Sequence, residues 1–371
     1  MKPETGNIAP WTAACVQATF EMANPSYAGK LEGAPLKKRN LDMMCSYIDA
    51  CFAGPLALPV RLVCFPEFSI GGMYNTRTTT EQVKKYQAIT IPGPETDRLA
   101  AKAKEYNVYI AAVNHENDPL RPDFFFNTAF IISPKGKIIL KYRKLNTQFG
   151  CNPHDVYDEY VNPVTKTRDF FPVVETEIGR LSCGICADLW VQEIPRAYAF
   201  KGADIWLHLT AGHFYENGEA LLRARAIDNT IYVLHENFAS QVVNTRRLGD
   251  TRIATHISSG YGGNSMVLDY YGNILARALG TGEELVMADI DVMKLRAVRQ
   301  NYRRSLRGNA VAQTRTELFA PYYNRTIFPP NRTIKEGPMR HTNDELVEER
   351  RQQAVQNVLS GYSFYSEKDV K

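Results

Sequence analysis

The chain has 371 residues, of which 44% are hydrophobic, so it can bury a large core as one big domain or as two smaller ones. Its formal net charge of +4 is spread along the chain and gives no electrostatic argument for binding nucleic acid or a membrane. Seven cysteines without framework spacing, no signal-peptide h-region and no apolar run of membrane length predict a soluble cytoplasmic protein.

Strand-like and helix-like segments alternate between residues 10 and 300. Mixed hairpins and helices of this kind are typical of two sheets covered by helices, rather than of one all-parallel sheet. The turns at 133–136 and 270–273 predict two hairpins. The predicted strands are 11–17, 60–65, 108–114, 127–132, 137–142, 181–185, 204–208, 231–236, 263–269 and 274–278, and the predicted helices are 38–53, 95–106, 193–200 and 217–229.

Cys186 follows the apolar run 181–185 and precedes the predicted helix at 193–200. Such a strand-to-helix elbow exposes a side chain and directs backbone N–H groups at it, which suits a nucleophile. Taken alone, a cysteine in an apolar strand is more often a small buried hydrophobe. Cys183 and Cys186 also form a CxxC pair that suggests redox chemistry. However, residues three apart in a strand point to opposite faces, and a redox CxxC normally opens a helix.

Two charged residues stand at the ends of predicted strands. Pro66 is expected to end the strand 60–65, which leaves Glu67 just beyond the end of this strand. Lys144 follows the strand 137–142. Taken singly, each is more often a solvated charge at a strand terminus. Together with Cys186 they supply what acyl transfer needs: a base for the thiol and later for water, and a cation for the oxyanion.

Several short motifs, in this order along the chain, resemble those of the nitrilase, or carbon–nitrogen hydrolase, superfamily. Each motif alone is a weak pattern, but the ordered set covers about residues 10–300 and is specific. The motifs are FPE at 65–67, IPGP at 91–94, NTAF at 127–130, YRK at 142–144, GICAD at 184–188 with Glu193, RARAIDN at 223–229, GNSM at 263–266, and Gly272.

The resemblance implies an α/β fold, a four-layer α-β-β-α sandwich of the nitrilase type, and a triad of Glu67, Lys144 and Cys186. Glu67 is expected to take the thiol proton while Cys186 attacks a carbonyl carbon, with Lys144 and the Ala187 N–H holding the oxyanion. Ammonia or an amine then leaves, and water activated by Glu67 hydrolyses the thioester. The implied mechanism requires no metal and no cofactor.

Members of the family often carry a second glutamate, between the lysine and the cysteine, that orients the lysine and the substrate. Glu159 is the only glutamate between residues 144 and 174, and we assign this role to it. Asp155 and Asp158 lie close by in a loop-like segment at 147–167. A hydrated loop carboxylate is therefore the alternative, and whether the segment closes over the site is left open.

The residues after Cys186 indicate which class of substrate the protein accepts. Nitrilases resemble one another in a Cys-Trp-Glu sequence, whereas this chain has Cys-Ala-Asp at 186–188, as on the amidase side. Carbamoyl amino acid hydrolases tend to carry arginines where this chain has Leu189 and Trp190. Without a guanidinium fork there, a neutral, apolar or aromatic acyl group is favoured. An amidase for small linear amides is predicted, with N-carbamoyl amine hydrolase and, less favoured, nitrilase activity as alternatives.

Four aromatic or imidazole side chains are candidates for the substrate pocket, with core packing as the alternative for each. The seven histidines show no metal-ligand spacing. Two non-hydrolase classes stay open, a thiol redox protein using Cys183 and Cys186 and a catalytically silent scaffold. The pocket candidates are Tyr74, Trp190, His213 and Phe214.

The sequence changes character near residue 305. We expect a hydrolase domain at 1–305 and a C-terminal extension at 306–371. Within the extension, 324–337 is Pro-rich and predicted to be extended, and a helix is predicted from about 345 to Gly361. Its modest apolar face needs a partner surface. The resemblance implies that such tails pack on a neighbouring subunit, which predicts a homodimer or a larger homo-oligomer.

Overall fold

The computed structural model contains two six-stranded sheets. The residues that it describes are 7–21, 33–73, 78–147, 150–160, 169–212, 217–239, 262–300, 309, 311–324, 326–337 and 345–362, together with the backbone of 244–248 and 251–255. No helix in this described part of the chain combines the length and the apolarity that crossing a membrane requires.

The first sheet has the strand order β14-β1-β2-β3-β4-β5. Its centre is parallel, because β1 pairs with β2 and β2 with β3 in the same direction, whereas β14, β4 and β5 are antiparallel to their neighbours. The strands are β1 (Trp11–Gln17), β2 (Val60–Glu67), β3 (Tyr109–Glu116), β4 (Phe126–Ile132), β5 (Ile138–Arg143) and β14 (Glu284–Ile290).

The second sheet has the order β13-β12-β9-β8-β7-β6, and its central strands β7, β8 and β9 are parallel. The predicted hairpins at 133–136 and 270–273 are confirmed, since β4–β5 and β12–β13 pair antiparallel across them. The strands are β6 (Val174–Thr176), β7 (Gly179–Ile185), β8 (Ile205–Leu209), β9 (Tyr232–Glu236), β12 (Met266–Leu268) and β13 (Ile274–Arg277).

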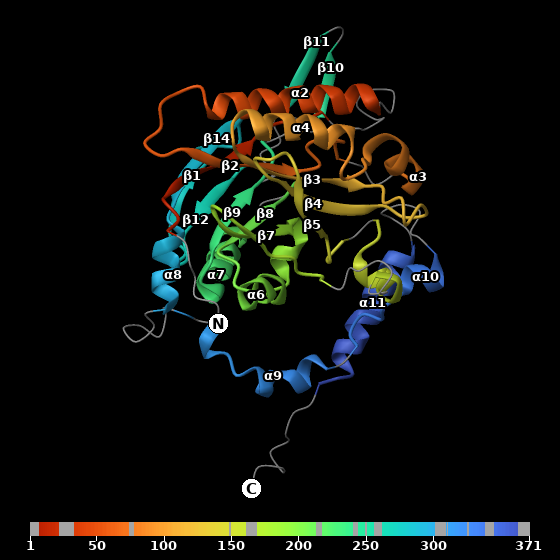
Figure 1. Cartoon of the computed structure of the whole chain (residues 1–371). Coiled ribbons are helices and arrows are strands. Elements are labelled where there is room, and N and C mark those ends of the chain that lie inside the picture. The colour runs from red at the N-terminus through yellow and green to blue at the C-terminus, as the bar shows by residue number, and fades with distance from the viewer. Residues whose placement is uncertain are drawn as a thin grey trace.

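Helices cover the outer face of each sheet. α2 (Ala34–Cys51) and α4 (Pro94–Glu105) lie over the first sheet, and α6 (Glu193–Phe200) and α7 (Gly218–Asn229) lie under the second (Figure 1). The largest apolar cluster fills the space between the sheets and continues onto α6 and α7. The α-β-β-α sandwich predicted from the family resemblance is therefore confirmed.

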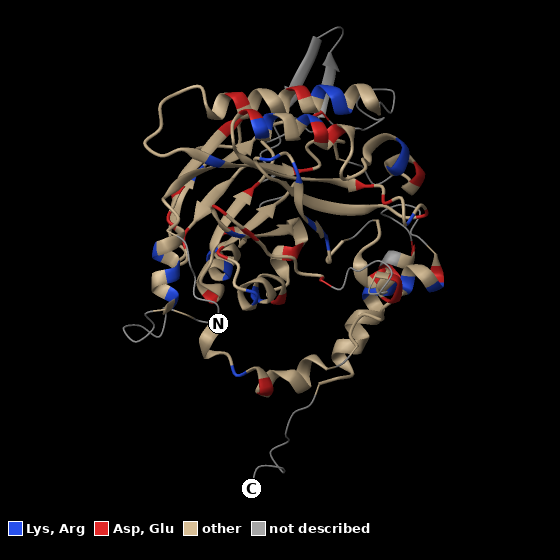
Figure 2. Ribbon diagram, in the orientation of Figure 1, with Lys and Arg blue, Asp and Glu red and all other residues tan. Residues whose placement is uncertain are grey.

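The two helices over the first sheet show how the sequence builds an outer layer. Leu41 and Met44 of α2 and Leu99 of α4 are buried against the sheet, which follows from apolar residues recurring at helical spacing. Lysine, arginine and acidic residues are interspersed on the outer faces (Figure 2), and Lys37 pairs with Glu95 across the two helices at 3.2 Å. An ion pair at the protein surface stabilises little, so apolar burial holds this layer.

The end of β2 differs from the prediction. Pro66 was expected to end the strand, but β2 continues through it to Glu67. A shift in the pairing register with β3 lies between Cys64 and Glu67, where a residue without an N–H is tolerated. The N–H of Glu67 then donates to the carbonyl oxygen of Thr210, just after β8 in the second sheet, at 3.2 Å. This irregularity joins the ends of the two sheets.

The C-terminal extension contains a helix that was not predicted. Segment 324–337 was expected to be extended, but Arg332–Glu336 forms α10. Asn331 precedes it with a left-handed φ of 63°, donates its N–H to the carbonyl of His154 at 3.0 Å and accepts from the Asp158 N–H at 2.8 Å. These tertiary contacts, which no local pattern encodes, explain the error. In Figure 1 the helix at 316–323 (α9) lies below α6, and α10 lies to the right, where it contacts the short helix at Pro153–Val156.

The predicted C-terminal helix is confirmed as α11, while the domain division at residue 305 stays a prediction. The hairpin of β10 and β11 was not predicted. The remaining elements are α3 (Thr80–Gln82), η1 (Val83–Gln87), η2 (Pro153–Val156), α5 (Tyr157–Tyr160), η3 (Cys186–Trp190), β10 (Asn244–Leu248), β11 (Thr251–Thr255), α8 (Val292–Gln300), η5 (Val311–Gln313), α9 (Thr316–Tyr323) and α11 (Glu345–Leu359).

Candidate active site

A buried ion pair lies at the end of the first sheet. Glu67 is 1% exposed and Lys144 is 8% exposed, and the Nζ of Lys144 lies 2.9 Å from Oε1 of Glu67. Neither residue is the solvated strand-end charge that was the alternative. Burying two charges costs desolvation energy that only close pairing and further hydrogen bonds offset. Such a pair, isolated from water, is a preorganised charge arrangement.

Asn127 on β4 fixes both members of this pair. Its Nδ2 donates to Oε1 of Glu67 at 2.5 Å, and its carbonyl oxygen accepts from the N–H of Lys144 at 2.9 Å. The second contact extends the antiparallel pairing of β4 with β5 by one residue. One residue therefore sets the position of the carboxylate through its side-chain amide and that of the lysine backbone through its main-chain carbonyl.

Cys186 begins η3 directly after β7, as the predicted strand-to-helix elbow requires. It is partly exposed and has a φ of 46°, in the left-handed region that residues with a side chain seldom adopt. The buried carboxylate of Asp188 supports the turn, since it accepts from the N–H of Ile185 at 2.9 Å and from the hydroxyl of Tyr142 at 2.8 Å. Strained backbone conformations of this kind cluster at functional sites.

The electrostatic surroundings of the Cys186 thiol connect it with the ion pair. Burial raises the pKa of this thiol above its usual value, Lys144 lowers it, and Glu67 raises it. The structure thus brings the three triad candidates together from β2, the end of β5 and the end of β7. The net direction is upward, so the resting sulfur is a thiol that needs a base before it can attack.

Glu159 lies on α5 and pairs with Arg121, whose Nη1 is 3.3 Å from its Oε2. Its side chain is 45% exposed, unlike that of Asp155 in the same segment, which is buried. Burial raises the pKa of Asp155. The segment predicted to be loop-like contains the short helices η2 and α5. The role assigned to Glu159 stays a prediction.

Of the four candidates for the substrate pocket, the structure describes Trp190. Tyr74, His213 and Phe214 lie outside the described residues. Trp190 ends η3 and is 48% exposed, whereas Leu189 is buried in the core, where its carbonyl accepts two hydrogen bonds from Arg225.

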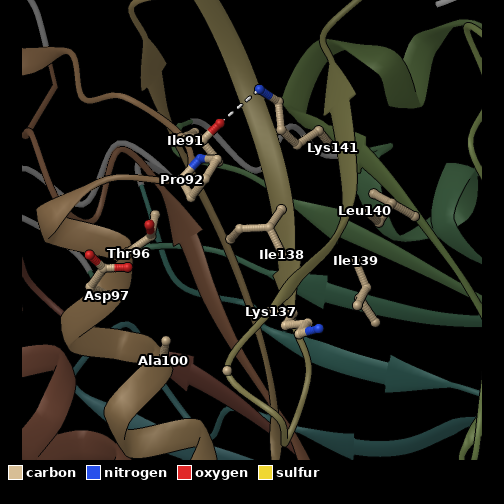
Figure 3. Close-up of a pocket in the computed structure, with 11 residues that line it drawn as sticks. Ile91, Pro92, Thr96, Asp97, Ala100, Lys137, Ile138, Ile139, Leu140 and Lys141 are labelled. Atoms are coloured by element: carbon tan, nitrogen blue, oxygen red, sulfur yellow. Dashed lines mark hydrogen bonds between the residues drawn. The ribbon is translucent and has the colours of Figure 1, made fainter.

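One cleft among the described residues lies away from the candidate site. It has a volume of about 590 Å³ and lies between the start of α4 and the edge strand β5. Figure 3 shows its wall, where Lys141 donates to the carbonyl of Ile91 at 3.0 Å. None of the triad candidates lines it. This cleft is therefore separate from the candidate catalytic residues.

The structure gives the redox alternative no support. Cys183 is fully buried and not paired with Cys186, and burial raises the pKa of its thiol, which disfavours thiolate exchange. Among the described residues, no group of His, Cys, Asp or Glu side chains is arranged to hold a metal ion.

Sequence reasoning assigned no role to Asn127, Asp188 or His208. All three are polar side chains in or beside buried apolar strands, and each hydrogen-bonds within the candidate site. A polar residue that interrupts an apolar strand was the available signal. It does not by itself tell a structural hydrogen bond from a catalytic one.

Comparisons with known proteins place the whole sandwich in one family. The carbon–nitrogen hydrolase family matches residues 12–300. Omega-amidase NIT2 of Bos taurus is 29% identical over 290 residues, covering 76% of this chain and 92% of NIT2, and a formamidase of Bacillus thuringiensis is 33% identical over 185 residues, covering 48% and 51%. The crystal structure of Saccharomyces cerevisiae Nit3, a member of the nitrilase superfamily, is 25% identical, covers 78% of this chain and 93% of Nit3, and superposes with a TM-score of 0.58. The chain belongs to the carbon–nitrogen hydrolase family.

Proposed function

We propose that this protein hydrolyses the C–N bond of small linear amides through a thioester on Cys186. The products are a carboxylic acid and ammonia or an amine. The observation that carries the proposal is the buried Glu67–Lys144 ion pair, 2.9 Å between Nζ and Oε1, acting electrostatically on the partly exposed Cys186. A base, a cation and a sulfur nucleophile in one place are the components of acyl transfer.

Glu67 is the general base of the first step. The hydrogen bonds from Lys144 and from Asn127 fall on Oε1, and we assign to Oε2 the role of accepting the thiol proton. A base is required because the pKa of Cys186 is raised. As the proton moves to Glu67, the sulfur forms a bond to the amide carbon.

Lys144 and the backbone N–H of Ala187 stabilise the oxyanion of the tetrahedral intermediate. When the C–N bond breaks, the leaving amine takes the proton from Glu67 and the thioester remains. Glu67 then removes a proton from water, whose oxygen attacks the thioester carbon. The carboxylic acid departs and the sulfur recovers its proton, which restores the starting enzyme.

The substrate class follows from the relatives and from the surroundings of the site. The relatives named omega-amidase and formamidase support an amide. Arg121 is engaged with Glu159, and Arg143 with Glu116 and Asp118. With these guanidinium groups neutralised, a neutral acyl group is favoured over an anionic one. Tyr74, Trp190, His213 and Phe214 remain the proposed pocket residues, and Glu159 the proposed second glutamate.

A homodimer or larger homo-oligomer is proposed as the working form. Phe200 on α6 and Phe319 and Tyr322 on α9 are at least half exposed, although α9 already lies on α6 through a 2.8 Å hydrogen bond from the Tyr323 hydroxyl to Glu193. Exposed aromatic clusters are typical of interfaces. Sedimentation of the purified chain tests this, and a fully active monomer would contradict it.

The chemistry is tested by trapping the intermediate. The enzyme is mixed with formamide, a dicarboxylic acid monoamide, an N-carbamoyl amine and a nitrile, acid-quenched, and its Cys186 peptide analysed by mass spectrometry. We expect the acyl mass on Cys186 with formamide, less of it with the anionic dicarboxylic acid monoamide, and loss of hydrolysis in Cys186→Ala. Cys183→Ala is the matched control and should keep its activity. An adduct on another residue, or hydrolysis by a folded Cys186→Ala, would refute the mechanism, whereas an adduct from the carbamoyl amine alone would redirect the substrate class.

A further inference from the structure

Two buried histidines lie side by side behind the elbow. His208 on β8 and His235 on β9 are paired in register and are 1% and 2% exposed. Their rings stack with centroids 5.0 Å apart and planes 15° apart. The two Nδ1 atoms are 2.8 Å apart, and Nε2 of His208 is 2.9 Å from the carbonyl oxygen of Cys186. The proposed mechanism uses neither ring.

The hydrogen bonds fix the proton positions on both rings. A carbonyl oxygen only accepts, so Nε2 of His208 must donate to Cys186. Burial lowers the pKa of His208 to about 4 and the pKa of His235 well below its ordinary value, so both rings are neutral at neutral pH. A neutral imidazole has one donor and one acceptor. Nδ1 of His208 therefore accepts from Nδ1–H of His235, and the chain of donors runs from His235 through His208 to Cys186.

The carbonyl that ends this chain belongs to the same peptide unit as the Ala187 N–H. In a planar trans peptide the C=O and the N–H point in opposite directions. Holding the Cys186 carbonyl toward His208 therefore directs the Ala187 N–H away from His208. A hydrogen bond to the carbonyl also polarises the peptide and strengthens its N–H as a donor.

The neighbouring backbone shows why this peptide needs support. Cys186 has a φ of 46°, a conformation that persists only where surrounding contacts impose it. The next carbonyl, that of Ala187, accepts from Nδ2 of Asn146 at 2.9 Å. Hydrogen bonds from the two side chains thus fix two consecutive peptide units at the nucleophile.

We propose that His208, itself oriented by His235, is the positioning residue that aims the Ala187 N–H at the substrate oxyanion. The inference rests on the proposed function, in which this N–H and Lys144 share the negative charge. Because His208 acts through the carbonyl oxygen of Cys186, its contribution appears in the chemical step and not in substrate binding. Its removal therefore lowers kcat and leaves KM and the reactivity of the Cys186 thiol nearly unchanged.

Two substitutions at His208 separate hydrogen bonding from packing. His208→Leu removes the donor, and His208→Gln offers an amide N–H at about the reach of Nε2. Met266 pairs in register with His235 on its other side, so Met266→Leu is a matched control that alters packing beside the rings without removing a hydrogen bond.

For His208→Leu we expect kcat to fall about tenfold to hundredfold, less than the 10²–10³ that removing an oxyanion donor outright costs. Its KM and its rate of iodoacetamide alkylation at Cys186 should stay close to those of the unsubstituted enzyme. His208→Gln should recover most of kcat, and Met266→Leu should keep it. An unchanged kcat in His208→Leu, or no recovery in His208→Gln, overturns the inference.

A spectroscopic readout does not depend on any variant's activity. In ¹⁵N-histidine-labelled enzyme, NMR should show His208 as the Nε2–H tautomer and His235 as the Nδ1–H tautomer, with His208 assigned by the loss of its signals in His208→Gln. The reverse tautomers, or a protonated His208 at pH 7, overturn the inference. Hydrolysis retained by Cys186→Ala overturns the proposed function and this inference together, whereas an inactive Cys186→Ala beside a fully active His208→Leu overturns this inference alone.

Discussion

Two buried glutamates each lie near a thiol, and a lysine forms an ion pair with the first of them. Glu67 lies near Cys186 and forms an ion pair with Lys144. Glu236 lies beside Cys15 in the core. The two glutamates are equally buried, at 1% and 0% exposure. Each ends a parallel strand, β2 in one sheet and β9 in the other. Their chemistry should nevertheless be opposite.

The difference lies in what meets each carboxyl group. Glu67 accepts from Lys144 and from Asn127. Beside Glu236 lie the Cys15 thiol and the Val16 backbone, and burial and the thiol raise the pKa of Glu236 well above its usual value although the Val16 backbone lowers it. Burial alone turns a carboxyl group into a neutral acid, because the charged form loses its hydration. A buried base requires a cation and hydrogen bonds as well.

The largest expected effect comes from replacing each of the two glutamates by glutamine. Glu67→Gln keeps the shape but removes the base, so kcat/KM for amide hydrolysis should fall about 10³-fold. Glu236→Gln replaces a neutral acid by a neutral amide and should leave kcat/KM nearly unchanged. Steady-state ammonia release measures both. Equal losses in the two variants would show that burial, and not pairing with Lys144, decides the role.

The pH dependence of the free energy of unfolding provides a second test, in which the effect is expected at Glu236. The folded pKa of Glu236 is raised above its ordinary 4.5, so the folded state binds more protons than the unfolded state. This group's contribution to stability is complete below pH 4.5 and is lost as the pH rises toward the folded pKa. The loss is about 1.4 kcal/mol per pH unit while the folded group stays protonated.

Glu236→Gln should therefore gain stability relative to the unsubstituted protein as the pH rises from about 5 to 8. Urea unfolding at several pH values measures the difference, in which the other titrating groups cancel. A difference independent of pH would show that Glu236 is ionised in the folded protein, and the contrast with Glu67 would be lost.

The contrast between the two glutamates also shows which features of the fold and of the site can be predicted from the sequence. The central strands and the outer helices were predictable because their apolar residues recur at strand or helix spacing, whereas the edge strands β6 and β14 were not predicted. Ordered motifs identified Glu67, Lys144 and Cys186 as candidates. The continuation of β2 through Pro66 depends on a hydrogen bond to Thr210 in the other sheet, which no local pattern encodes. Glu67 and Glu236 both follow apolar strands in the sequence, and only the fold brings a lysine to one of them.

The amide that holds Glu67 should have an intermediate effect. Asn127→Leu removes the 2.5 Å hydrogen bond to Oε1 but keeps the main-chain contact with Lys144 and the volume of the side chain. Losing one hydrogen bond to a charged group costs about 1.5–3 kcal/mol, so kcat should fall about tenfold to hundredfold. Asn127→Asp places a second carboxyl group beside Glu67 and should be slower still. Full activity in both variants would leave the ion pair alone responsible for the position of Glu67.

The smallest effect concerns the two thiols. Lys144 lowers the pKa of Cys186 and Glu67 raises it, with Lys144 the stronger influence, whereas Cys15, next to Cys64 and Glu236, has no such cation and its pKa is raised well above the usual value. Lys144→Met should therefore raise the pKa of Cys186 and slow its alkylation by iodoacetamide at pH 8 severalfold, by the shift of about one pKa unit that a nearby charge produces. Lys141→Met is the matched control, because this lysine on the same strand pairs with Glu116 and does not act on the thiol. Unchanged or faster alkylation in Lys144→Met, measured on the Cys186 peptide, would mean that the lysine does not distinguish the reactive thiol from the inert one.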